Sequence, residues 1–241
     1  MFRKTLLALL ALVCAPAFAQ EDVVGQDIGQ SEIIVTGARR AVDGYDDHIP
    51  LIGLRRRADF AVQEVRITGD TRDPILRHNE MYAMIRGAIE LAGRRGVQLA
   101  IGDTVIEPLT LANYRDLALE RDSRPDSERM TFLVKTPLGE GIDSKAALDR
   151  VDAFIKAVPP VGRALIEKSG DLTLSVVKPD QYRDAIVGLV ADDALKMSQR
   201  FGADYGVEAK GIDRQVEWSR AGLTDVFLYI PYQLTILPKH R

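Results

Sequence analysis

Histidine and serine side chains are the first candidates for chemistry in this chain. The three histidines, His48, His78 and His240, lie far apart, and no two stand four residues apart, a spacing by which a helix presents two metal ligands. No Gly-x-Ser-x-Gly motif marks a nucleophilic serine, and a serine needs a partner base to react. We therefore assign no catalytic and no metal-binding residue, and we interpret the histidines as structural or solvent-exposed.

Paired carboxylates and a glycine pair are the next candidates. Two acids can divide the acid and base roles of a reaction, which draws attention to the Asp-Asp pairs at 46–47 and 192–193. Neighbouring residues of a helix point about 100° apart, so the pair at 192–193 does not converge on one substrate. The Gly-Glu-Gly run at 139–141 lacks the further glycine and the Gly-Lys-Ser of a phosphate loop. We interpret it as a turn and expect no cofactor.

Residues 1–19 show the three parts of a cleavable secretory signal. Two basic residues near the start precede a short apolar run at 6–13, and an Ala-Phe-Ala sequence closes the segment. We predict cleavage before Gln20 and a location in the periplasm. The apolar run is shorter than the roughly 20 residues that span a membrane, so no membrane insertion is expected. Cys14 leaves a lipoprotein as an alternative, although Val13 stands where a lipid-bearing cysteine normally has a small residue.

The composition after residue 19 limits the classes of partner. This part of the chain carries 30 basic and 35 acidic side chains, a net charge of −5, and it has no cysteine. The acidic balance argues against a nucleic acid or an anionic membrane as partner, and the arginine clusters at 55–57 and 94–95 are interpreted as solvated surface. Because no disulfide can form, stability must come from packing, for which a chain of 46% hydrophobic residues is sufficient.

The first half of the chain predicts a leader and one lobe. Residues 20–57 show no sustained period and predict a flexible leader, apart from a β-prone run at 32–37 that could pair with a sheet edge. Residues 58–119 predict a first lobe. Its elements are a strand at 60–67, a helix that Asp73 caps and Gly93 stops, and strands at 97–101 and within 105–119.

The second half predicts another lobe, at 129–238, after a charged linker at 120–129. Its elements are a strand at 130–134, a helix from Asp143 or Ser144, a strand at 172–176, a long helix from Pro179 to near Gly206, and two strands at 207–218 and 223–237 joined by a hairpin at 221–222. Pro231 predicts an edge or a bulge in the last strand. The order predicts an α+β fold of two lobes, each with helices packed on one face of a mixed or antiparallel sheet.

Residues 58–238 resemble the SIMPL domain family, a domain of unknown function whose bacterial members include periplasmic immunogenic antigens, and the correspondence is strongest at the end of the chain. The resemblance is carried by Ala-Asp-Asp-Ala-Leu-Lys-Met at 191–197, by Phe-Gly-Ala-Asp-Tyr-Gly-Val at 201–207, and by the closing strand at 226–237. Ala58-Asp59-Phe60 is similar to the start of the family's first strand. The resemblance implies a two-lobed α+β envelope protein over residues 58–238, often oligomeric, with no enzymatic residues generally assigned.

A second resemblance lies in the leader. The sequence Ser-Glu-Ile-Ile-Val-Thr-Gly-Ala-Arg-Arg at 31–40 is similar to the segment that opens the plug of TonB-dependent outer-membrane receptors. This chain has no room for the large barrel of such a receptor. The resemblance implies a segment that binds a partner by adding a strand, through Glu32, Ile33, Ile34, Val35 and Thr36.

Three functional hypotheses follow. The leading one is a periplasmic, non-enzymatic SIMPL-like protein that associates with itself or with an envelope partner, with a role in envelope stress as one possibility. The alternative is an accessory of TonB-dependent uptake that uses the segment from Glu32 to Gly37. The third is an enzyme whose site is assembled from scattered residues, and a deep pocket lined by converging ionisable groups would favour it.

Overall fold

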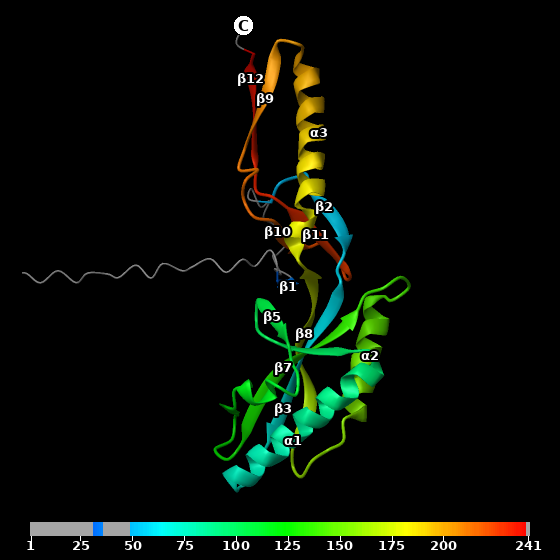
Figure 1. Ribbon diagram of the computed structural model, residues 1–241, viewed down its shortest axis with the longest axis vertical. Coiled ribbons are helices and arrows are strands. Elements are labelled where there is room, and N and C mark those ends of the chain that lie inside the picture. The colour runs from blue at the N-terminus through cyan, green and yellow to red at the C-terminus, as the bar shows by residue number, and fades with distance from the viewer. Residues whose placement is uncertain (1–30, 36–48, 240–241) are drawn as a thin grey trace, which may run out of the picture.

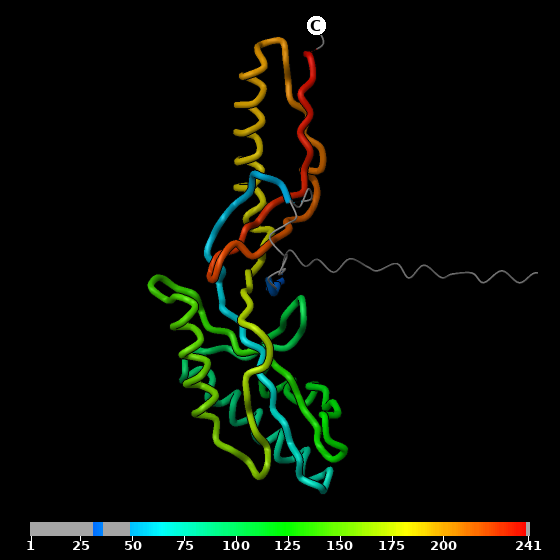
Figure 2. The backbone as a smooth tube through the Cα atoms, turned by 180° about the vertical axis from the view of Figure 1, so that it is seen from behind, coloured from blue at the N-terminus to red at the C-terminus, as the bar shows by residue number. Residues whose placement is uncertain are grey.

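The computed structural model describes residues 31–35 and 49–239, and it confirms the α+β class. Figures 1 and 2 show an elongated molecule with two helices beside a large sheet at one end and a third helix extending away from it at the other. The predicted signal at 1–19, Thr36, His48 and His240 lie outside the described residues. None of the helices in the described ranges is long and apolar enough to cross a membrane.

Seven antiparallel strands form the main sheet, and six of them close into a ring. The strands are β1 (Glu32–Val35), β3 (Phe60–Gly69), β4 (Gln98–Ile101), β5 (Val105–Pro108), β6 (Glu120–Arg121), β7 (Glu128–Pro137) and β8 (Leu165–Val177). The order β3-β8-β1-β5-β4-β7 returns to β3, because β3 also pairs with β7 over ten residue pairs. The strand β6 lies outside the ring and pairs with β7. Ring closure removes most of the open strand edges in this sheet.

Two helices cover the outer face of the ring. Helix α1 (Pro74–Ala92) is capped by Asp73, whose Oδ1 accepts hydrogen bonds from the backbone N–H groups of Ile75 and Leu76, and α2 (Ser144–Ala157) is capped by Asp143. The cap at Asp73 confirms the sequence prediction, and Asp143 is one of the two residues predicted for the start of the second helix. The largest core lies between the helices and the sheet, and it includes Val65, Ile67, Met81, Ile85, Met130, Phe132, Val151 and Phe154. We call this sheet with its two helices the body.

A smaller module stands on the body. Strands β10 (Glu217–Arg220), β11 (Asp225–Tyr229) and β2 (Leu54–Arg57) form a three-stranded antiparallel sheet, and helix α3 (Arg183–Phe201) begins beside it after a short 3-10 turn at Pro179–Tyr182. We call this sheet and the first half of α3 the neck. A second core joins neck and body, and it includes Ile33, Val35, Leu174, Val176, Ile186, Val226, Leu228 and Ile230. The hairpin of β10 and β11 confirms the predicted turn at 221–222.

The remaining strands, β9 (Tyr205–Lys210) and β12 (Gln233–Pro238), pair with each other and with no other described strand. Strand β9 lies beside the second half of α3, and β12 pairs with β9. We call residues 191–210 and 233–239 the finger. The sequence predicted single strands at 207–218 and 223–237, and each is divided in the structure. The second divides at Pro231, which has no N–H to continue a ladder, so β11 and β12 belong to different sheets.

Other boundaries also differ from the sequence prediction. The segment 120–129, predicted as a linker, contains β6 and the start of β7 within the main sheet, and that sheet includes strands from both predicted lobes. Two strands, β1 and β2, fall within the predicted leader at 20–57. Helix α3 ends at Phe201 because Gly202 adopts φ 107°, whereas the sequence predicted an end near Gly206. The strands β1 and β2 pair with segments that are far away in the sequence, and no local sequence pattern points to such partners.

Candidate functional site

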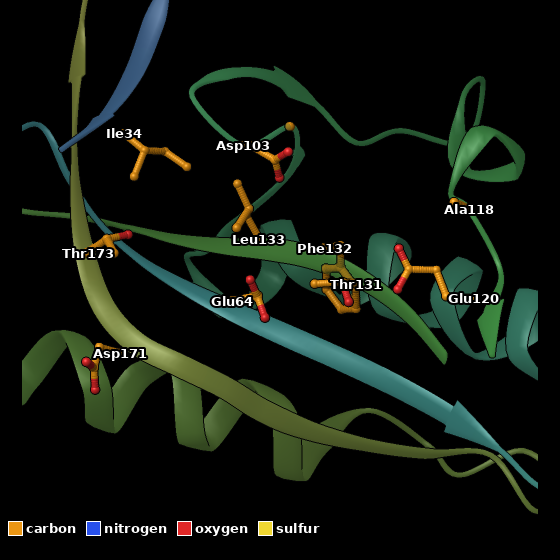
Figure 3. A pocket seen from close by; sticks show the side chains of 11 residues that line it. Ile34, Glu64, Asp103, Ala118, Glu120, Thr131, Phe132, Leu133, Asp171 and Thr173 are labelled. Carbon is orange, nitrogen blue, oxygen red and sulfur yellow. The ribbon is translucent and has the colours of Figure 1, made fainter. Parts of the chain in front are cut away.

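A groove on the main sheet is the first candidate. It has a volume of about 300 Å³, and its walls carry Glu64, Asp103, Glu120 and Asp171 around a floor that includes Ile34 and Leu133 (Figure 3). These side chains come from β3, the β4–β5 turn, β6, β8, β1 and β7. The groove therefore lies where strands from distant parts of the chain meet.

The chemistry of this groove is limited by its lining. The carboxylate of Glu120 accepts two hydrogen bonds from Arg129, at 3.1 and 2.9 Å. The other polar groups of the lining are carboxylates and the hydroxyls of Thr131 and Thr173, with no histidine, lysine or cysteine beside them. Among the described residues, no group of three His, Cys, Asp or Glu side chains is arranged to hold a metal ion. The groove can accept a cationic or hydrogen-bonding group, but it pairs no nucleophile with a base.

His78 has a structural contact. Its Nε2 lies 2.8 Å from Glu128 Oε2, and the same oxygen accepts a 2.7 Å hydrogen bond from Arg77 Nε. Burial disfavours the charge of Glu128, but the hydrogen bonds from Arg77 and His78 outweigh it and hold the pKa of Glu128 below its ordinary value. These contacts tie the start of α1 to the start of β7.

The other sequence candidates are dispersed. Asp192 is exposed on α3, and Asp193 is half-buried beside it. The run at 139–141 is a turn, as predicted, with Gly141 at φ 77°. The arginine cluster of β2 has specific partners: Arg56 binds Asp59 at 2.8 Å, and its guanidinium lies 4.4 Å from the centre of the Tyr182 ring. The pair at 46–47 lies outside the described residues.

The predicted partner-binding strand is buried inside the ring. Strand β1 pairs with β8 along one edge and with β5 along the other. The side chains of Ile33 and Val35 are fully buried in the core between body and neck, and Ile34 points into the ring. Glu32 accepts a hydrogen bond from Lys135 Nζ and another, at 2.5 Å, from Ser175 Oγ. An accessory role through this strand therefore requires β1 to leave both of its neighbours.

The finger is the second candidate, and sequence reasoning did not single it out as a surface. No side chain of residues 191–210 or 233–239 is buried. One face of its hairpin is apolar, because register pairs Leu234 with Ala209 and Ile236 with Val207. Large apolar side chains are nevertheless exposed on the finger: Leu195, Phe201, Tyr205 and Leu237, at 59, 55, 38 and 43%.

Hydrogen bonds hold the finger together at its tip. Ser198 Oγ donates a 2.9 Å hydrogen bond to the Tyr205 carbonyl oxygen, and Lys239 Nζ donates one of 3.0 Å to the Ala203 carbonyl oxygen. The rings of Phe201 and Tyr205 lie 6.3 Å apart. The shape of the finger is thus fixed by polar contacts of its backbone, while its apolar side chains stay accessible. These large exposed apolar side chains make the finger a candidate interaction surface.

The finger carries no net charge. Residues 191–210 and 233–239 contain four acidic and four basic side chains. Two such surfaces can approach each other without net repulsion. The outer edges of β9 and β12 also have no ladder partner within the described ranges. The finger therefore combines apolar contact, neutral charge and open strand edges.

The chain matches no protein-family model and no curated protein sequence.

Proposed function

We propose that this protein is an exported, non-enzymatic envelope protein that associates with copies of itself through the finger. The observation that carries this proposal is the absence of any buried side chain in residues 191–210 and 233–239. A two-stranded sheet is marginal in water by itself, and α3 contacts this one chiefly through β9. Association would supply the missing layer.

A second copy fits this surface better than a charged partner. The finger is neutral, so it does not select a strongly basic or acidic molecule. Apolar side chains of one finger can pack on those of a second, and an open strand edge can pair with the same edge of another copy. An isologous contact about a two-fold axis requires a surface that complements itself in this way. The SIMPL resemblance, in which members are often oligomeric, agrees with this proposal.

The test is the mass of the mature protein in solution, measured by size-exclusion chromatography with light scattering. We expect an oligomer, and we expect Leu195→Asp to shift it toward the monomer because a carboxylate would be buried in the contact. Leu223→Asp is the matched control, since Leu223 is 70% exposed but lies in the β10–β11 turn, away from the finger. A wild-type protein that is monomeric at all concentrations, or two variants with equal effects, would contradict the proposal.

The proposed location has a separate test. Mass spectrometry of the protein recovered from the periplasm of a bacterial host should give an N-terminus at Gln20. A protein that stays in the cytoplasm with Met1 attached would remove the exported role.

The accessory role in TonB-dependent uptake is the second candidate, and it is favoured by the sequence at 31–40. Its test is binding of the full-length mature chain to the periplasmic domain of TonB, with a variant lacking residues 31–40 as control. Undetectable binding by the intact chain would exclude this role.

A further inference from the structure

The place that β1 occupies is a strand-shaped slot. Strands β5 and β8 do not pair with each other, and β1 fills the space between them with only four residues. It pairs with β8 at all four positions, and Ile34 N donates a further hydrogen bond of 3.0 Å to the Thr104 carbonyl oxygen. Figure 1 shows β1 at the junction of body and neck. We call the space between β5 and β8 the β1 slot.

The slot recognises side chains as well as backbone. At its first position, Glu32 meets the ammonium group of Lys135, and the two side chains are only 14 and 7% exposed. Lys135 Nζ also lies 4.1 Å from the centre of the Phe60 ring. A residue without a negative charge at this position would leave a buried ammonium group without its carboxylate.

The next three positions require apolar side chains on alternating faces. Ile33 and Val35 enter the core between body and neck, and Ile34 enters the ring beside Val62, Leu133 and Ile106. The slot therefore selects an extended segment with one acidic residue followed by three apolar residues. This pattern is that of β1 itself.

We infer that the β1 slot also accepts β1 from a second copy of this chain, by reciprocal strand exchange. Every contact of β1 with β5, β8, Lys135 and Ser175 can be made with the same residues of another copy, so exchange conserves them all. Exchange of an identical element is a low-cost route to a dimer for this reason. The inference does not depend on the finger, although a finger contact would raise the local concentration of the second strand.

Two charge-reversal variants test the exchange directly. Glu32→Lys places two cations in its own slot, and Lys135→Glu places two anions there, so each variant weakens its own β1. Only exchange between the two variants restores opposite charges in both slots. The double variant Glu32→Lys/Lys135→Glu is the matched control, because it restores the pair within one chain.

The experiment mixes the two single variants, each carrying Leu195→Asp so that the finger contact is removed. We expect a 1:1 heterodimer by native mass spectrometry and a melting temperature above that of either variant alone. Folded variants that stay separate in the mixture, while the double variant melts like the parent, would overturn the inference. Because the finger is disabled throughout, failure here is distinguishable from failure of the proposed function.

A covalent trap decides the question if either charge variant does not fold. Ile33 of β1 and Val176 of β8 are register partners, so cysteines at these positions on separate copies can bond only after exchange. In a chain with Cys14→Ser, we expect a mixture of Ile33→Cys and Val176→Cys to give a crosslinked heterodimer under oxidation. A mixture of Ile33→Cys and Leu223→Cys is the control. Equal crosslinking in the two mixtures, or none in either, would overturn the inference.

A peptide identifies a different occupant. A synthetic peptide of residues 31–37 carries the pattern that the slot selects, and it can be titrated into the Glu32→Lys variant. Peptide binding without any heterodimer in the mixing experiment would assign the slot to a segment of another polypeptide and would overturn exchange between copies.

Discussion

The body and the finger are built from the same kinds of element, but they bury their side chains to very different extents. In the body, two capped helices cover a ring of strands, and side chains such as Phe132 and Phe154 are almost fully buried. In the finger, one helix lies beside two strands and no side chain is buried. The body has the layers that a stable fold needs, whereas the finger lacks one. This difference places a large buried core in the body and leaves the apolar side chains of the finger accessible.

The largest predicted difference concerns aromatic truncation. Phe154→Ala should destabilise the protein by about 3–5 kcal/mol, because it leaves a cavity in the largest core. Phe201→Ala on the finger should change the stability of the monomer by less than about 0.5 kcal/mol, as exposed substitutions usually do. Urea denaturation at low protein concentration measures both. Equal effects would show that the finger is part of the cooperative core.

The second-largest predicted effect is the loss of stability when the buried ion pair of Glu32 and Lys135 is broken. Lys135→Met should lower the free energy of unfolding by up to about 3–5 kcal/mol, because it leaves the Glu32 carboxylate buried without its cation. The double variant Glu32→Leu/Lys135→Met should recover most of this loss, since it removes both charges. The comparison is made by thermal and urea denaturation. A double variant as unstable as the single one would mean that the pair stabilises the ring beyond charge neutralisation.

Removal of a helix cap in the body should have a smaller effect on stability. Asp73→Ala removes the acceptor for two backbone N–H groups at the start of α1 and should cost about 1 kcal/mol. The residue before α3, Tyr182, makes no side-chain cap hydrogen bond, so α3 has no such contribution to lose. We expect Asp73→Ala to lower the melting temperature. A change within error for Asp73→Ala would show that the start of α1 is held by its tertiary contacts alone.

The smallest predicted effect is a dependence on pH at the contact between α1 and β7. The pKa of Glu128 is lower in the folded protein than in the unfolded chain, so this group contributes stability above its unfolded pKa. That stability is lost as the pH falls through the folded pKa. In acid, Glu128→Gln should therefore flatten the fall of melting temperature with pH. An unchanged acid profile in the variant would contradict this role.

The elements of this fold that depend on local sequence could be predicted. Asp73 caps α1 where its type and position indicated, and Asp143, which caps α2, is one of the two residues predicted for that place. At Pro231 the sequence predicted an edge or a bulge, whereas the structure divides the strand there between two sheets. The glycine run at 139–141 is a turn for a similarly local reason. Such features are set by residues within a few positions of one another, which a single sequence displays.

The arrangement of distant segments could not be predicted. Strand β1 pairs with residues 174–177, far along the chain, and no local pattern shows that Glu32 meets Lys135. The exposure of the finger was hidden for a related reason. The apolar residues of 191–207 are spaced as in any buried helix and strand, and only the tertiary structure shows that no further layer covers them.

Hydrogen exchange measured at several protein concentrations tests the central claim most directly, because it reports on finger and body in the same sample. We predict that amides of β9, β12 and the second half of α3 become more protected as the concentration rises, while amides of β3, β7 and α1 keep constant protection. Finger amides that are as protected at the lowest concentration as at the highest, or unprotected at both, would contradict an assembly surface on the finger.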